Sequence, residues 1–157
     1  MDKMIADQLI GRLIRNSSTT EMFVFVLICG LSGVRIDIGA LIIHEGFEYR
    51  ARNLVRLARV VGVEEVLLSE LDSWSRRAVT MYAKRNYVAH ATWTQGDADE
   101  VGGAFSMKKL LKSPSDEILG QAELEQLCEE ADSVVAEGNA LFFRFIREVP
   151  GAWPSRI

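Results

Sequence analysis

A long stripe of residues at alternating four- and three-residue steps runs through the middle of this sequence. All but one of its members are apolar: Leu67, Leu71, Trp74, Ala78, Met81, Arg85 and Val88. Residues at this spacing share one face of an α-helix, so the stripe predicts a long amphipathic helix packed against a core. The rest of the sequence shows no pattern of paired β-strands, and we therefore expect an all-α fold of four to five helices.

Arg85 stands in the stripe where an apolar residue is expected. A guanidinium group stays charged and is costly to bury alone, so Arg85 must be paired, reach a wet cavity or bind an anion. Asn86 and His90 are four residues apart and share a helix face. At about 100° per residue, His90 lies roughly 140° around the helix from Arg85. The two side chains therefore converge only if the helix end tightens or a second chain contributes.

The segment Arg85-Asn86-Tyr87-Val88-Ala89-His90, with Trp93 following, resembles the signature of the HEPN superfamily (higher eukaryotes and prokaryotes nucleotide-binding domain). These are small all-helical domains, often dimeric, and many are metal-independent endoribonucleases with an arginine, a short gap and a histidine. The resemblance implies a single HEPN-like helical domain over residues 1–149, followed by a C-terminal tail at 150–157. It also implies a homodimer with the motif helices near its axis.

The resemblance further implies catalytic roles for three residues of the motif. His90 would be the general base that takes a proton from the ribose 2′-hydroxyl, and histidine suits this role because its unperturbed pKa is about 6.5. Arg85 would bind the phosphate and stabilise the charge that builds on its oxygens. Asn86 would orient the imidazole or the phosphate.

The same residues are compatible with three other interpretations. In the first, Asn86 and His90 have a structural role, and their side chains satisfy nearby backbone groups at the end of the helix. The main functional alternative is a non-catalytic helical dimer module that binds a nucleotide or a protein partner. The third is a toxin or antiphage effector, which would act on RNA and be held by an antitoxin or another protein partner.

The charge distribution indicates where RNA would bind. A net charge of −4 argues against indiscriminate binding to nucleic acid, but residues 50–90 carry eight Lys or Arg against four Asp or Glu. Three arginines recur at steps of four and three on one predicted helix face, Arg52, Arg56 and Arg59. With Lys84, they are the candidate RNA-binding residues, and a solvated polar face is the alternative.

Composition and motifs argue against several other classes of protein. The longest apolar run, 22–31, is ten residues, whereas a membrane-spanning helix needs about 20. Two isolated cysteines, Cys29 and Cys128, lie among apolar neighbours, so we expect reduced core thiols in a cytoplasmic protein. No zinc-binding set and no glycine-rich phosphate loop is present, and we predict neither a metal nor a cofactor. A serine or cysteine nucleophile paired with His90 stays open, without local support.

The rest of the chain also reads mainly as helix. Turn or capping residues at 16–20 follow a predicted helix at 2–15. The next segment, 22–29, is apolar on all sides, which predicts a buried helix covered on more than one side, with another subunit as one candidate cover.

Beyond it, the sequence predicts helices at 37–44, 47–61 and 121–148 and, around residues 94–115, a loop or short hairpin insertion. The core residues expected in the second and third of these helices are Phe47, Ala51, Leu54, Ala58, Val61, Leu124, Leu127, Cys128, Ala131, Val135, Leu141, Phe142 and Phe145.

Overall fold

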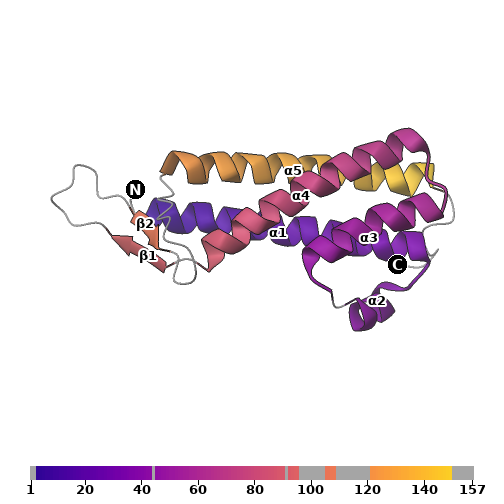
Figure 1. Ribbon diagram of the computed structural model, residues 1–157, viewed down its shortest axis with the longest axis horizontal. Helices are drawn as coiled ribbons and strands as arrows, with labels where there is room; N and C mark the ends of the chain where they lie inside the picture. The colour runs from indigo at the N-terminus through magenta and orange to yellow at the C-terminus, as the bar shows by residue number, and fades with distance from the viewer. Residues whose placement is uncertain (1–2, 44, 91, 96–104, 109–120, 150–157) are drawn as a thin grey trace. The chain divides into compact units, whose positions relative to one another are not determined.

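The computed structural model describes residues 3–43, 45–90, 92–95, 105–108 and 121–149 (Figure 1). Within these ranges the chain is an all-α helical bundle with five helices and one two-stranded sheet. The elements in chain order are α1 (Lys3–Ser32), α2 (Ile36–Ile42), α3 (Phe47–Val60), α4 (Glu65–Ala89), β1 (Thr92–Gln95), β2 (Phe105–Lys108) and α5 (Gln121–Glu148). The predicted fold class is therefore confirmed.

The contacts of the chain fall into two compact units. The first unit comprises Met1–Ser17 with Met81–Asp132, and the second comprises Ser18–Thr80 with Ser133–Ile157. The helices α1, α4 and α5 each contribute one section to either unit. The single domain expected over residues 1–149 stays a prediction, and the tail expected at 150–157 lies outside the described residues.

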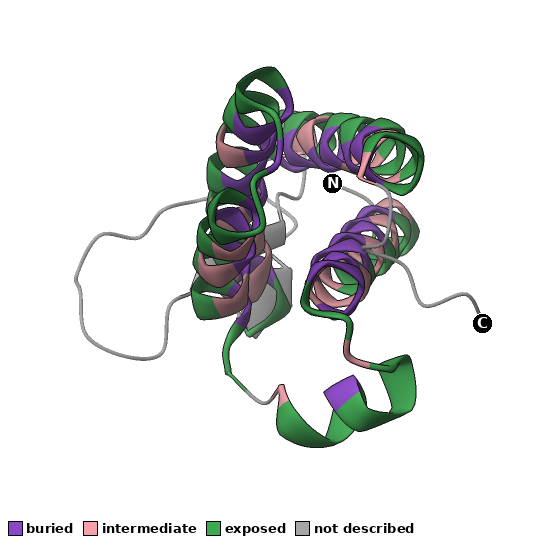
Figure 2. Ribbon diagram, turned by 90° about the vertical axis from the view of Figure 1, so that its right-hand side faces the viewer, coloured by how far each residue is buried: buried purple, intermediate pink, exposed green. Residues whose placement is uncertain are grey.

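The apolar stripe on α4 is buried as its spacing predicts. Each apolar member of the stripe is at most 2 % exposed, whereas Arg85 is half-buried. Along each helix buried positions alternate with exposed ones (Figure 2), as amphipathic helices require. The stripe therefore fixes which face of α4 turns inward, and it places Arg85 at the edge of a core.

In the second unit α5 packs closely on Trp74 of α4. The indole Nε1 donates a 2.8 Å hydrogen bond to the carbonyl oxygen of Val134. A Cβ atom on Gly138 would lie 2.8 Å from Trp74 Cζ2 and 3.0 Å from Phe23 Cδ2, so only glycine fits there without a shift. The predicted core of α5 needs two corrections. Val134 is buried in place of Val135, and Phe142 is only half-buried.

The break predicted at residues 16–20 is wrong, because α1 runs through it without interruption. Ser17 Oγ donates a 2.8 Å hydrogen bond to the carbonyl oxygen of Leu13 and is fully buried. Asn16 donates to the carboxylate of Asp132 on α5, which also accepts from Arg12. The hydrogen bond from Arg12 is the main cause that lowers the pKa of Asp132. These polar side chains therefore find partners inside a continuous helix instead of capping two shorter ones.

The apolar segment at 22–29 is part of α1, and the chain's own second unit covers much of it. Phe23, Val24, Leu27 and Cys29 are buried, whereas Met22 is 53 % exposed. Gly39 of α2 lies directly against Cys29 and Phe25. The predicted buried helix is confirmed in part, since Phe25 is only half-buried. Cover by a second subunit stays a prediction. The burial of this segment no longer requires it, because the chain itself covers much of the segment.

The remaining elements follow the predicted order with small shifts. The hairpin predicted around residues 94–115 starts two residues earlier, since β1 and β2 pair antiparallel with Thr92 opposite Lys108 and Gln95 opposite Phe105. Gly62 has a φ of +79° just after α3, the conformation expected of a glycine that ends a helix. The core position predicted for Val61 is wrong, since this residue is 42 % exposed because α3 has already ended at Val60.

Among the described residues, no single helix is both long and apolar enough to cross a membrane. In the described part of the chain, α1 and α2 taken together are long and apolar enough, but they are bent by 110° at the break between them.

Candidate functional site

Arg85 lies in the first unit, near the C-terminal end of α4. Its Nη1 donates a 2.8 Å hydrogen bond to Oδ1 of the neighbouring Asn86. Its Cζ lies 5.4 Å from the centroid of the Tyr82 ring, which is within the range of a cation–π contact. Its Nε is buried and has no hydrogen-bond partner among the described residues. Among the described residues, the side chain of Asn86 is thus hydrogen-bonded to the guanidinium group of Arg85 and not to the imidazole of His90.

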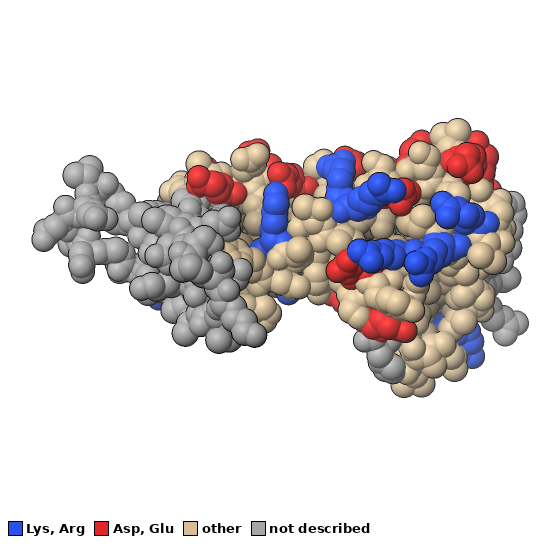
Figure 3. Space-filling model, in the orientation of Figure 1, with Lys and Arg blue, Asp and Glu red and all other residues tan. Residues whose placement is uncertain are grey.

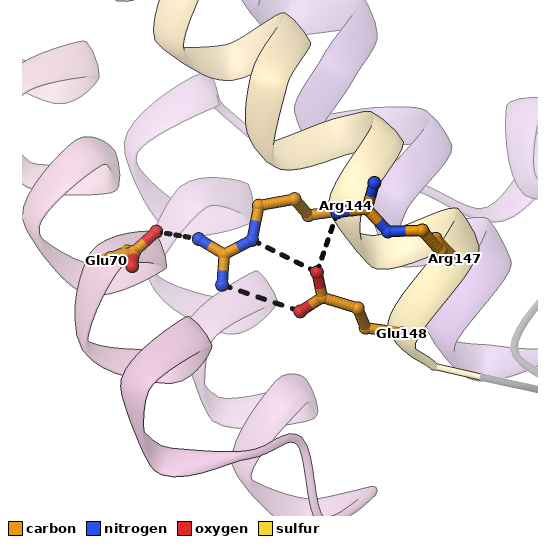
Figure 4. Close-up of polar contacts among 4 residues, drawn as sticks. All are labelled: Glu70, Arg144, Arg147 and Glu148. Carbon is orange, nitrogen blue, oxygen red and sulfur yellow. Dashed lines mark hydrogen bonds and ion pairs between the residues drawn. The ribbon is translucent and has the colours of Figure 1, made fainter.

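Among the residues that the structure describes, Arg85 differs from the other half-buried arginines in having no carboxylate beside it. Arg144 is bound by both Glu70 and Glu148 (Figure 4). Arg50 also has a buried Nε without a hydrogen-bond partner, but it pairs with Glu21.

Within the described ranges Arg85 forms no ion pair, so its positive charge meets only an amide and an aromatic ring. A half-buried charge with so little compensation is costly. Of the three environments expected for this arginine, pairing with a carboxylate is thus not found in the part of the chain that the structure describes.

His90 follows the last residue of α4 and is exposed. Its backbone N–H donates a 3.1 Å hydrogen bond to the carbonyl oxygen of Asn86, four residues earlier. This is the α-helical pattern, so the helix end does not tighten, and one of the two ways to bring His90 towards Arg85 is absent. No hydrogen bond or ion pair to the imidazole occurs among the described residues. The contact between His90 and nearby backbone groups that the helix-end interpretation requires is thus not found among the described residues.

The candidate RNA-binding residues occur in both units. Lys84 lies in the first unit, where its Nζ pairs with Glu130 at 3.1 Å. Three of the arginines of α3, Arg52, Arg56 and Arg59, line a hollow of about 500 Å³ in the second unit. Figure 3 shows Lys and Arg side chains gathered over α3 and the facing part of α4. The hollow also includes Arg76 of α4, which the sequence did not single out. Its place in the 50–90 basic segment was a signal, but assigning it to this hollow requires the packing of α3 on α4.

The two cysteines are free and buried, as predicted. Burial raises the pKa of the Cys29 thiol. Burial is also the main reason why the pKa of the Cys128 thiol is raised. Because the thiolate is the nucleophilic form, both are poor candidates for a nucleophile partnered with His90. No group of three or more His, Cys, Asp or Glu side chains within the described ranges is placed to hold a metal ion.

No protein-family model matches this chain, and no curated protein or solved structure shows a significant similarity to it.

Proposed function

We propose that this protein is a metal-independent endoribonuclease of the HEPN type. The observation that supports the proposal is Arg85, a half-buried guanidinium without a carboxylate partner in the described residues, five residues before an exposed histidine. An RNA phosphate would supply the missing negative charge. Because one N–H of Arg85 is already held by Asn86, the group is oriented before the phosphate arrives.

In this reaction the ribose 2′-hydroxyl is the nucleophile. The neutral imidazole of His90 takes its proton as the 2′-oxygen attacks the adjacent phosphorus, and Arg85 stabilises the negative charge on the phosphate oxygens. The bond to the 5′-oxygen then breaks, and this oxygen leaves with a proton from the imidazolium ion or from water. The products are a 2′,3′-cyclic phosphate and a 5′-hydroxyl. Asn86 acts as a positioning residue through Arg85.

The proposed enzyme is a homodimer whose site combines residues of two chains. The regular hydrogen bond from His90 to Asn86 leaves the roughly 140° separation between Arg85 and His90 in place. A second copy would supply His90 to the Arg85 of the first, and a closed two-fold arrangement would build two such sites. Lys84 would contact phosphates of the bound RNA, as would Arg52, Arg56 and Arg59 of α3. Buried free thiols suit the reducing cytoplasm, where we place this activity.

Incubation of the purified protein with single-stranded RNA in excess EDTA tests the proposal. We expect cleavage products that end in a 2′,3′-cyclic phosphate and a 5′-hydroxyl, identified by mass spectrometry. DNA of the same sequence should stay intact because it lacks the 2′-hydroxyl. RNA binding without cleavage would favour the non-catalytic module instead. Cleavage that depends on added divalent metal would reject the roles assigned to Arg85 and His90.

A further inference from the structure

The hollow between α3 and α4 in the second unit has the charge and position of a separate anion site. Its lining combines residues from both helices: Arg52, Val55, Arg56, Arg59, Asp72, Ser75, Arg76 and Val79. Four of these side chains are positive and one is negative. A solvated face of a single helix explains a row of arginines on α3, but it does not explain a fourth arginine from α4 at the same hollow.

Two of the four arginines have no carboxylate partner within the described ranges. Within these ranges the guanidinium group of Arg56 donates one hydrogen bond, to the amide oxygen of Asn53 at 3.5 Å, and Arg59 forms no ion pair. Arg76 is held by Asp72 at 2.6 Å, within one turn of α4. Arg52 is held by Glu48, which does not line the hollow. The lining therefore has an excess of positive charge, centred on Arg56 and Arg59.

The inner wall of the hollow offers little else that could bind a ligand by polar contacts. Val55 is buried, and the buried hydroxyl of Ser75 donates a 3.1 Å hydrogen bond to the carbonyl oxygen of Ala51. The guanidinium groups at the rim are thus the available donors, and their planar forks match phosphate oxygens. A volume of about 500 Å³ is within the range of small-ligand sites.

We propose that this hollow binds adjacent phosphate groups, with Arg56 and Arg59 as the principal ligands and Arg76 as the third. Two linked phosphates carry on the order of three negative charges, which matches the excess of positive charge in the lining. Such groups occur in free oligophosphates and along an RNA backbone. The site lies in the second unit and does not depend on cleavage at Arg85 and His90.

Titration calorimetry with inorganic pyrophosphate, and in a second arm with a single-stranded 2′-O-methyl RNA oligonucleotide, which lacks the free 2′-hydroxyl that cleavage needs, tests this site at low salt. In the double variant Arg56→Gln/Arg59→Gln, binding should weaken by roughly tenfold or more because two charge-assisted contacts are lost. Asp72→Asn should instead strengthen binding, since it removes the one carboxylate of the lining and releases Arg76. Thermal unfolding of each variant checks that the substitutions leave the fold intact.

The double variant Arg35→Gln/Arg147→Gln is the matched control, because it removes the same charge at exposed positions that do not line the hollow. Full binding by this control, with loss in the Arg56/Arg59 variant, supports the site. If pyrophosphate shows this pattern, the ligand is a free oligophosphate; if only RNA shows it, the ligand is the RNA backbone. Equal losses in both double variants, or no binding of either probe to the native protein, would overturn the proposal. Whether variants of Arg85 or His90 still cleave RNA does not change the outcome of this binding test.

Discussion

Replacement of His90 by alanine is expected to slow RNA cleavage by about 10²–10⁴-fold, the usual cost of losing one general base. Binding of RNA should persist, because Arg85 and the arginines of α3 keep their charges. Since His90 is exposed and its imidazole makes no hydrogen bond within the described residues, the free energy of unfolding should be nearly unchanged. Single-turnover rates with end-labelled RNA in EDTA measure the effect directly.

The other histidine of the chain, His44, provides a matched control. His44→Ala should cleave at the native rate under the same conditions. If His90→Ala cleaved as fast as the native protein, His90 would not be the base. The cleavage would then come from a different site or from a contaminating nuclease. RNA binding that weakens as salt rises should be shared by the native protein and both variants.

Truncation of Trp74 to alanine is expected to lower the free energy of unfolding by about 3–5 kcal/mol, as for other buried aromatic residues. The indole is 2 % exposed, donates to the carbonyl of Val134 and lies against Gly138, so its removal leaves a cavity between α4 and α5 in the second unit. Urea denaturation followed by circular dichroism gives the change in stability.

Val60→Ala is the control for this experiment, because Val60 is 82 % exposed and its truncation should change the free energy of unfolding by less than about 0.5 kcal/mol. Trp74→Phe should fall between the two, since it keeps an aromatic ring but loses the hydrogen bond. A cost below about 1 kcal/mol for Trp74→Ala would show that α5 does not pack on Trp74 in solution.

The sequence predicts well those elements whose identity rests on the burial of apolar residues at helical spacing. The stripe on α4 and the bounds of α5 are examples, because the buried face of a long helix requires apolar residues at every turn. The predicted break in α1 failed for a different reason. Asn16 and Ser17 by themselves favour a cap or turn, and they are accommodated inside a helix by partners such as Asp132, which lies 116 residues beyond Asn16.

The candidate site could be foreseen only in part. The phase of Arg85 within an apolar stripe is enough to mark this residue as unusual. Whether a carboxylate compensates its charge depends on the neighbouring helices, as Arg50 and Arg144 illustrate by finding theirs. Arg76 was missed because its place beside the row of arginines on α3 is a consequence of packing, and no local pattern encodes it.

The central claim is that Arg85 of one copy and His90 of another complete one cleavage site, and mixed dimers test it most directly. Arg85→Met keeps the side-chain volume and should not reduce stability, because it removes a poorly compensated charge. On its own this variant should be inactive, as should His90→Ala.

When the two inactive variants are unfolded together and refolded at equal concentration, half of the dimers should be mixed, and each mixed dimer regains one of its two sites. We therefore predict about one quarter of the native cleavage rate per chain. A mixture no more active than the two variants measured separately would contradict a site shared between two chains.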